Sequence, residues 1–219
     1  MSGWERLRPK TVVLAIALLC CTVELILQAA DYGLIGSARW RPLAYQNGAF
    51  WAGLLHNWKP NYAAQPWAMF VTYSALHGGF GHLVGNMVAL LTLAPVVLER
   101  MSQRSFLGLW LASAIGGAAV FGLLSQSPQP MVGASGALFG LAGAWKASDW
   151  RAARNAHEPL WPILLWVLGI AVLNLVLWVV QGGLLAWETH LGGFVAGWAW
   201  VMLWPEKTAP TEVKAGAGG

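Results

Sequence analysis

Three short polar motifs interrupt the long apolar stretches of this 219-residue chain. The first contains His82 and Asn86, the second places Ser135 within Gly-Ala-Ser-Gly, and the third begins at His190 and continues Leu-Gly-Gly. Histidine, serine and asparagine are residue types that a hydrolase uses as base, nucleophile and transition-state donor. Polar side chains are costly inside a lipid bilayer, so these residues are candidates for a functional site.

The composition is that of a membrane protein. Hydrophobic residues make up 57% of the chain and charged residues only 10%, whereas soluble domains carry about 25% charged residues. Long apolar stretches cover residues 11–30, 78–98, 105–145, 160–181 and 191–205. The third stretch is about twice the ~20 residues that span a bilayer, and a turn rich in Ser and Pro at 125–130 divides it. The sequence therefore predicts an all-α polytopic membrane protein with six transmembrane helices.

The basic residues predict the orientation of these helices. With six spans, most of the 13 lysines and arginines fall on the side of both termini: Arg6, Arg8, Lys10, Arg100, Arg104, Lys146, Arg151, Arg154, Lys207 and Lys214. The positive-inside rule then places both termini in the cytoplasm. The net charge of +4 follows from this asymmetry, and no nucleic-acid partner is expected. We expect a cytoplasmic N-terminus at 1–10, a membrane domain at 11–205 and a disordered cytoplasmic tail at 206–219.

An outer loop at about residues 31–67 separates the first two spans. Within it, five apolar residues recur at helical spacing: Phe50, Trp51, Leu54, Leu55 and Trp58. This pattern predicts a helix that lies in the membrane interface with its aromatic side toward lipid.

The expected topology places the polar motifs at a similar depth. At 1.5 Å per residue, Ser135 lies about 16 Å from the inner edge of the membrane, or about 21 Å if its helix continues to Asp149. The same count gives about 20 Å for Asn86, about 24 Å for His190 and about 26 Å for His82. In a hydrocarbon core of ~30 Å, all four lie in the outer half. Glycines four residues apart, at 136 and 140 in the fourth span and at 193 and 197 in the sixth, allow these two helices to approach closely. Their approach could bring His190 within hydrogen-bond reach of Ser135.

Together, these motifs resemble the signature of the rhomboid intramembrane serine proteases. The resemblance covers about residues 67–203 and implies a rhomboid-like bundle with a membrane-associated outer loop between helices one and two. It implies that Ser135 is the nucleophile and His190 the general base of a Ser–His dyad. It also implies that His82 and Asn86, with the Ser135 backbone N–H, form the oxyanion hole. The family lacks an acidic third member, so packing is expected to orient His190.

Further residues are expected around this dyad. The resemblance implies that Phe139 packs on the histidine, and the small residues beside the serine suggest a narrow substrate subsite: Gly133, Ala134 and Gly136. One departure from the family lies in the outer loop, where Trp67 is followed by Ala68 in place of arginine. His77 is interpreted as structural, Asn174 as a helix–helix hydrogen bond, and Glu24 as lining the cavity or as a snorkelling or neutral carboxyl.

The function implied by the resemblance is cleavage of transmembrane segments of single-pass membrane proteins, in contact with membrane lipid. It implies a multi-pass protein of a bacterial inner membrane whose active site faces the outer side. No cofactor and no metal are expected: haem ligation leaves Ser135 and Asn86 unexplained, and the zinc motif His-Glu-x-x-His is absent. The alternative is a rhomboid-like protein that binds transmembrane clients without cutting them, although such proteins have usually lost the serine or a catalytic histidine. The oligomeric state and the natural substrate stay open.

Overall fold

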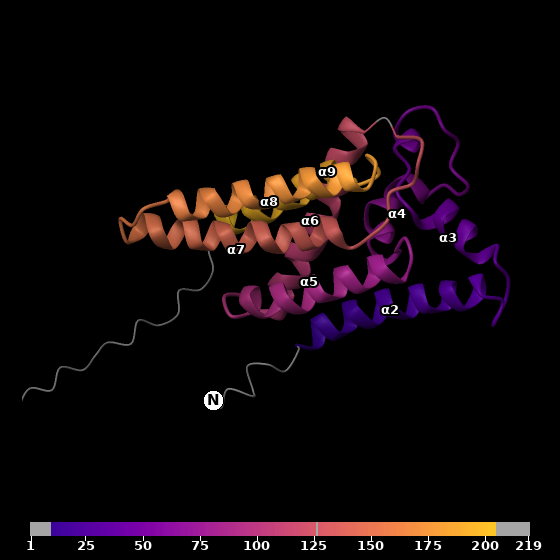
Figure 1. The fold of residues 1–219 in the computed structure, drawn as a ribbon, viewed down its shortest axis with the longest axis horizontal. Coiled ribbons are helices and arrows are strands. Elements are labelled where there is room, and N and C mark those ends of the chain that lie inside the picture. The colour runs from indigo at the N-terminus through magenta and orange to yellow at the C-terminus, as the bar shows by residue number, and fades with distance from the viewer. Residues whose placement is uncertain (1–9, 126, 205–219) are drawn as a thin grey trace, which may run out of the picture.

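The computed structural model describes residues 10–125 and 127–204, which form a bundle of helices. Six long helices make up the bundle: α2 (Thr11–Asp31), α5 (Phe80–Leu98), α6 (Gln103–Leu124), α7 (Ser135–Asn155), α8 (Trp161–Val180) and α9 (Trp187–Leu203). Four short elements lie between α2 and α5: α3 (Trp40–Gly48), η1 (Ala52–Leu55), α4 (Gln65–Thr72) and η2 (Tyr73–Ala75). Figure 1 shows α3 and α4 gathered at one end of the bundle. The expected all-α class is therefore confirmed.

Four of the described helices are long and apolar enough to cross a membrane: α2, α5, α6 and α8. The other two long helices, α7 and α9, are not among these four, for different reasons. The second half of α7 carries Lys146, Asp149, Arg151 and Arg154, and α9 has only 17 residues. Helix α7 packs inside the bundle against α6 and α9, whereas α9 keeps an exposed apolar side. A helix enclosed by protein does not need the continuous apolar surface that lipid demands.

The two central helices approach each other at glycines, as predicted. A Cβ atom on Gly193 would overlap the carbonyl oxygen of Gly136, and a Cβ on Gly197 would overlap the carbonyl oxygen of Gly140. Larger residues at these positions would push α9 away from α7. The glycines therefore fix the separation of the two helices that carry Ser135 and His190.

Helix α8 is held much more loosely than its neighbours. It contacts α7 and α9, yet only Ile163 of its 20 residues is buried. The remaining apolar surface of α8 is available to lipid or to another transmembrane helix.

The helix predicted to lie in the membrane interface does not form in the outer loop. The backbone of Phe50 donates to Met131 O at 3.0 Å and accepts from Met131 N at 2.9 Å, which holds residue 50 in an extended bridge. Helix α3 has already ended at Gly48, and only the short 3-10 helix η1 follows. The Phe50 ring is fully buried against three aromatic rings, those of Phe70, Tyr73 and Phe121. The backbone pairing and this burial overrode the helical spacing of the apolar residues.

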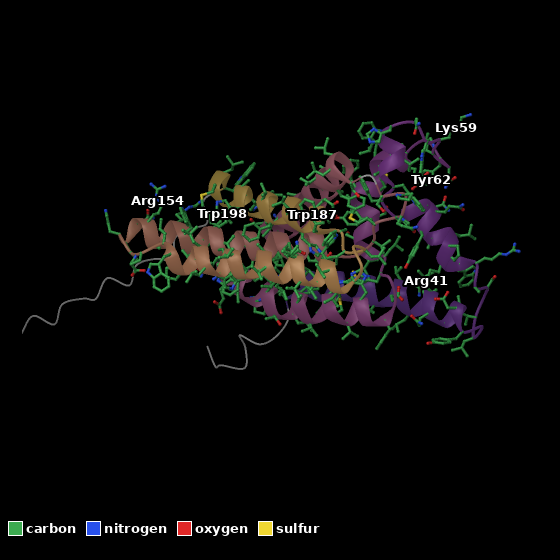
Figure 2. All side chains as sticks on the ribbon, turned by 45° about the horizontal axis from the view of Figure 1, so that its top comes forward. Arg41, Lys59, Tyr62, Arg154, Trp187 and Trp198 are labelled. Atoms are coloured by element: carbon green, nitrogen blue, oxygen red, sulfur yellow. The ribbon has the colours of Figure 1, made fainter. Side chains whose placement is uncertain are left out.

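The two ends of the bundle carry different basic residues. Figure 2 shows Lys59 and Arg154 at opposite ends of the molecule, in agreement with the separation on which the expected orientation depends. Near the end that carries Arg154, Arg100 and Lys146 both pair with Asp149, at 2.9 Å and 2.7 Å. The expected tail at 206–219 and nearly all of the expected N-terminal segment lie outside the described residues.

Candidate active site

Ser135 and His190 lie within hydrogen-bond distance of each other. Ser135 is the first residue of α7, and His190 lies in the first turn of α9. The distance between Ser135 Oγ and His190 Nε2 is 2.9 Å. Gly133 precedes this helix start with φ of 125°, a conformation that residues with side chains rarely adopt. The chain can therefore turn sharply into α7 and present the serine at the helix end.

Two further side chains contact the His190 ring. Phe139, one turn after Ser135 on α7, stacks on the imidazole with ring centroids 4.1 Å apart and planes 4° from parallel. Asn174 of α8 places Oδ1 2.7 Å from His190 Nδ1. The helix–helix hydrogen bond expected for Asn174 therefore exists, and its partner is His190. The ring therefore has a stacking contact and also a hydrogen-bond partner that sequence reasoning had not assigned to this site.

His82 and Asn86 line the same cavity as Ser135 and His190, and its volume is about 890 Å³. Asn86 Nδ2 donates to the backbone oxygen of His82 at 2.9 Å. His82 Nδ1 accepts from the backbone N–H of Gly78 at 3.1 Å. A neutral imidazole carries one proton, so this contact leaves the proton on His82 Nε2 as a donor.

Several polar residues line this cavity. Its lining includes the side chains of Ser125, Ser127, Gln129, Gln181 and Glu188. A polar cavity of this size can hold several water molecules, which a hydrolytic reaction requires. Within the part of the chain that the structure describes, no three His, Cys, Asp or Glu side chains gather into a possible metal site.

The small residues expected to form a subsite do not line this cavity. Ala134 is fully buried. Gly136 faces α9, because a Cβ there would lie 2.7 Å from Thr189 Cγ2. Gly133 faces His82, whose Cε1 would lie 2.7 Å from an added Cβ. These residues are small because helices and the His82 ring approach them.

A second, apolar cavity of about 590 Å³ lies between α8 and α9 and is also lined by His190. Phe139 and Asn174 line it together with His190, and the rest of its lining is apolar, including Val167, Ile170 and Phe194. His190 therefore lines both cavities, as do Trp178 and Trp187.

Arg41 is linked to His82 through the peptide group between His77 and Gly78. Its guanidinium binds both oxygens of the fully buried Glu24, at 2.8 Å and 2.9 Å, and donates to His77 O at 3.1 Å. The His77 carbonyl and the Gly78 N–H belong to one peptide group, and that N–H donates to His82. Arg41 and the Tyr45 hydroxyl, which donates to the same carbonyl at 2.5 Å, therefore together hold the peptide that fixes the His82 tautomer. Hydrogen bonding to Glu24 raises the pKa of Arg41, which stays charged.

His77 packs edge-on against His82, with ring centroids 5.3 Å apart. Burial lowers the pKa of His77 to about 4, and the neighbouring His82 adds to this shift. A neutral, buried ring at this position agrees with the structural interpretation of His77.

Comparison with known proteins identifies the family. The rhomboid domain matches residues 63–206 of this chain. RHOMBOID-like protein 5 of Arabidopsis thaliana is 36% identical over 126 residues, which is 56% of this chain and 39% of that protein. Rhomboid-type serine protease 2 of Emericella nidulans is 33% identical over 138 residues, or 63% of this chain and 27% of that protein. Rhomboid-like protease 1 of Toxoplasma gondii is 29% identical over 208 residues, or 89% of this chain and 64% of that protein.

The chain therefore belongs to the rhomboid family and is an integral membrane protein. At the level of the family, this is a group of intramembrane proteases that act on transmembrane substrates within membrane lipid. The similar proteins include some named as proteases and some named only as rhomboid-like. The chain spans less than two thirds of the length of each of the three relatives.

Proposed function

We propose that this chain is an intramembrane serine endopeptidase that cleaves transmembrane segments of single-pass membrane proteins with Ser135 and His190. The observation that carries this proposal is the 2.9 Å contact between Ser135 Oγ and His190 Nε2 at the wall of a polar cavity. A nucleophile in hydrogen-bond contact with a base, and a third group on the base, is the arrangement that nucleophilic catalysis requires.

The proposed chemistry begins with attack of Ser135 Oγ on the carbonyl carbon of the substrate while His190 Nε2 takes the hydroxyl proton. His190 then gives this proton to the leaving amine, and the C–N bond breaks to leave an acyl-serine. Water from the cavity attacks the acyl group with His190 again as base. The C–O bond to Ser135 breaks, and the serine recovers its proton.

The negative oxygen formed in each attack needs donors that are already in place. Ser135 is the first residue of α7, so its backbone N–H has no acceptor within the helix. His82 offers Nε2–H, because its Nδ1 already accepts from Gly78. Asn86 uses one amide proton on His82 O and has a second one available. These three donors are the proposed oxyanion hole.

We further propose that both termini lie in the cytoplasm of a bacterial cell and that the cavity opens toward the outer side of its inner membrane. The excess of basic residues on the side of the termini supports this orientation. A bacterial protein is among the relatives: the rhomboid protease GluP of Bacillus subtilis is 37% identical over 78 residues, or 36% of this chain and 15% of that protein.

The test uses the full chain in detergent, with a serine-directed fluorophosphonate probe and a single-pass substrate. We expect labelling and cleavage by the wild type and neither by Ser135→Ala. We expect no cleavage by His190→Ala, and a double variant no worse than either single one. Ser105→Ala, at the far end of α6 from the cavity, is the matched serine control and should behave as wild type.

Turnover by folded Ser135→Ala would contradict the proposal. A wild-type chain that binds a single-pass segment, takes up no probe and leaves the segment intact would support the non-catalytic alternative instead.

A further inference from the structure

We infer that Asn174 is a positioning residue that holds His190 in the tautomer able to accept the Ser135 proton. This inference rests on the proposed function and adds a third member to the proposed dyad. The observation is a line of contacts across one ring: Asn174 Oδ1 lies 2.7 Å from Nδ1, and Ser135 Oγ lies 2.9 Å from Nε2. Three helices, α7, α8 and α9, supply one side chain each.

The tautomer decides whether His190 can act as a base. A neutral imidazole carries its proton on one nitrogen and a lone pair on the other. The amide oxygen of Asn174 is only an acceptor, so the proton must lie on Nδ1 for this hydrogen bond to form. The lone pair of Nε2 then faces the Ser135 hydroxyl. The opposite tautomer would present an N–H to the serine and could not take its proton.

Because the surroundings of His190 and Asn174 are apolar, the Asn174 oxygen is the acceptor for the Nδ1 proton of His190. The cavity on this side of the ring is lined by Phe139, Val167, Ile170, Leu175 and Phe194 beside the pair itself. Such a cavity gives water few partners, and a hydrogen bond in apolar surroundings is stronger than one in water. Phe139 fixes the plane of the ring by stacking. Stacking alone does not decide which ring edge faces Ser135, whereas the amide oxygen does.

An amide orients the ring without adding charge. The helices packed against His190 present Ser135, Phe139 and Asn174, and none of these carries a charge. The other ionisable groups that line the polar cavity are His82 and Glu188. A carboxylate in place of the amide would keep the acceptor and also stabilise the imidazolium. Asn174→Asp and Asn174→Leu therefore separate orientation from charge.

The kinetic test uses these two variants of the full chain, with Leu173→Ala as the matched control. Leu173 is the neighbouring residue of α8 and is exposed. We expect Asn174→Leu to lower kcat about 100-fold with little change in KM, because loss of orientation costs about this factor. Asn174→Asp should recover most of kcat, and the acidic limb of its pH–rate profile should move to higher pH. Leu173→Ala should match the wild type.

The spectroscopic test needs only the folded wild type. In protein labelled with 15N-histidine, with His190 assigned by comparison with His190→Ala, we expect at neutral pH a protonated Nδ1 and an unprotonated Nε2. The opposite tautomer in the wild type would overturn the inference, and so would wild-type kcat in Asn174→Leu. An Asn174→Asp variant that is folded but as slow as Asn174→Leu would also overturn it. A wild type that cleaves nothing would instead contradict the proposed function, while the tautomer could still be read.

Discussion

Phe139 lies face to face with the imidazole of His190, with ring centroids 4.1 Å apart and planes only 4° from parallel. Phe139 follows Ser135 by one helical turn, so α7 supplies both the proposed nucleophile and a flat wall for the base. The imidazole cannot tilt toward α7 without moving this ring. The contact therefore blocks tilting of the His190 ring toward α7.

Replacing Phe139 with Leu should slow cleavage, because the flat contact disappears while most of the apolar volume stays. Aromatic pairs contribute about 0.5–1.5 kcal/mol beyond their buried area, so we expect kcat to fall by roughly 2- to 13-fold. Phe139→Tyr keeps a flat ring and serves as the control with near-wild-type turnover. Steady-state cleavage of a single-pass substrate measures this. Equal rates for Phe139→Leu and wild type would show that the stack does not support the base.

Asn86→Ala should lower kcat by about 10²–10³, the usual cost of losing one oxyanion donor. The variant should stay folded, because water in the polar cavity can satisfy the groups that the amide leaves. Thr92→Ala is the matched control: Thr92 also bonds to a carbonyl four residues earlier on α5, but its side chain is exposed. Circular dichroism checks the fold. If the two variants cleaved equally fast, Asn86 would be a packing residue.

Sequence reasoning located the functional helices because their signals are local. Ser135 follows a glycine-containing turn, and α7 begins at that residue as expected. Glycines four residues apart predicted the approach of α7 and α9, because the absence of a side chain directly determines how close two helices can come. The charges in the second half of α7 are visible in the sequence too, but the packing of this half against neighbouring helices is a tertiary property.

Features that depend on contacts between distant segments could not be read from the sequence. The bridge between Phe50 and Met131 joins residues 81 positions apart, and no local pattern marks it. The small residues beside Ser135 suggested a subsite, whereas Gly136 is small because α9 contacts it. Asn174 gave a real signal as a polar residue in an apolar helix, but its partner became clear only when α8 and α9 were placed together.

Gly193→Ala should destabilise the bundle, because the new methyl group would overlap the carbonyl oxygen of Gly136. Overpacking of this kind costs roughly 1–3 kcal/mol, so Tm in detergent should fall. Gly169→Ala on α8 is the matched control, since no atom lies within 4 Å of the added Cβ. Alanine is favoured over glycine within a helix by about 1 kcal/mol, so Gly169→Ala should unfold at the wild-type temperature or above it. Equal melting of the two variants would contradict the close approach of α7 and α9.

Arg41→Met should destabilise the protein by about 3–5 kcal/mol, because it leaves the carboxylate of Glu24 buried without a partner. The double variant Arg41→Met with Glu24→Leu should recover most of this loss, since no buried charge remains. Denaturant unfolding in a fixed detergent measures both. In the double variant the peptide at residues 77–78 keeps the hydrogen bond from the Tyr45 hydroxyl but lacks its Arg41 contact, so cleavage should stay slower than in the wild type although stability returns. Full recovery of activity would show that Arg41 acts only on stability.

The choice of substrate should depend on how readily the substrate helix unwinds. A transmembrane helix keeps its peptide groups in internal hydrogen bonds, so Ser135 cannot attack one until the segment opens locally. Glycine, proline and polar residues near the outer end of the substrate make this opening less costly. Replacing them with leucine should therefore suppress cleavage even when the residues on either side of the cut are unchanged. A matched substrate with the same number of leucine replacements at its cytoplasmic end should be cut at the original rate.

Mass spectrometry of the products from this pair of substrates locates the cut and gives both rates. One cavity is lined by Ser135, His190, His82 and Asn86, and the loop before α7 lines it too. We therefore expect cuts in the outer half of the substrate helix or just beyond it. Cuts in the cytoplasmic half would contradict the proposed depth of the site. Equal rates for the stiffened and control substrates would show that unwinding does not limit cleavage, and that the proposed protease selects its substrates by contacts with side chains.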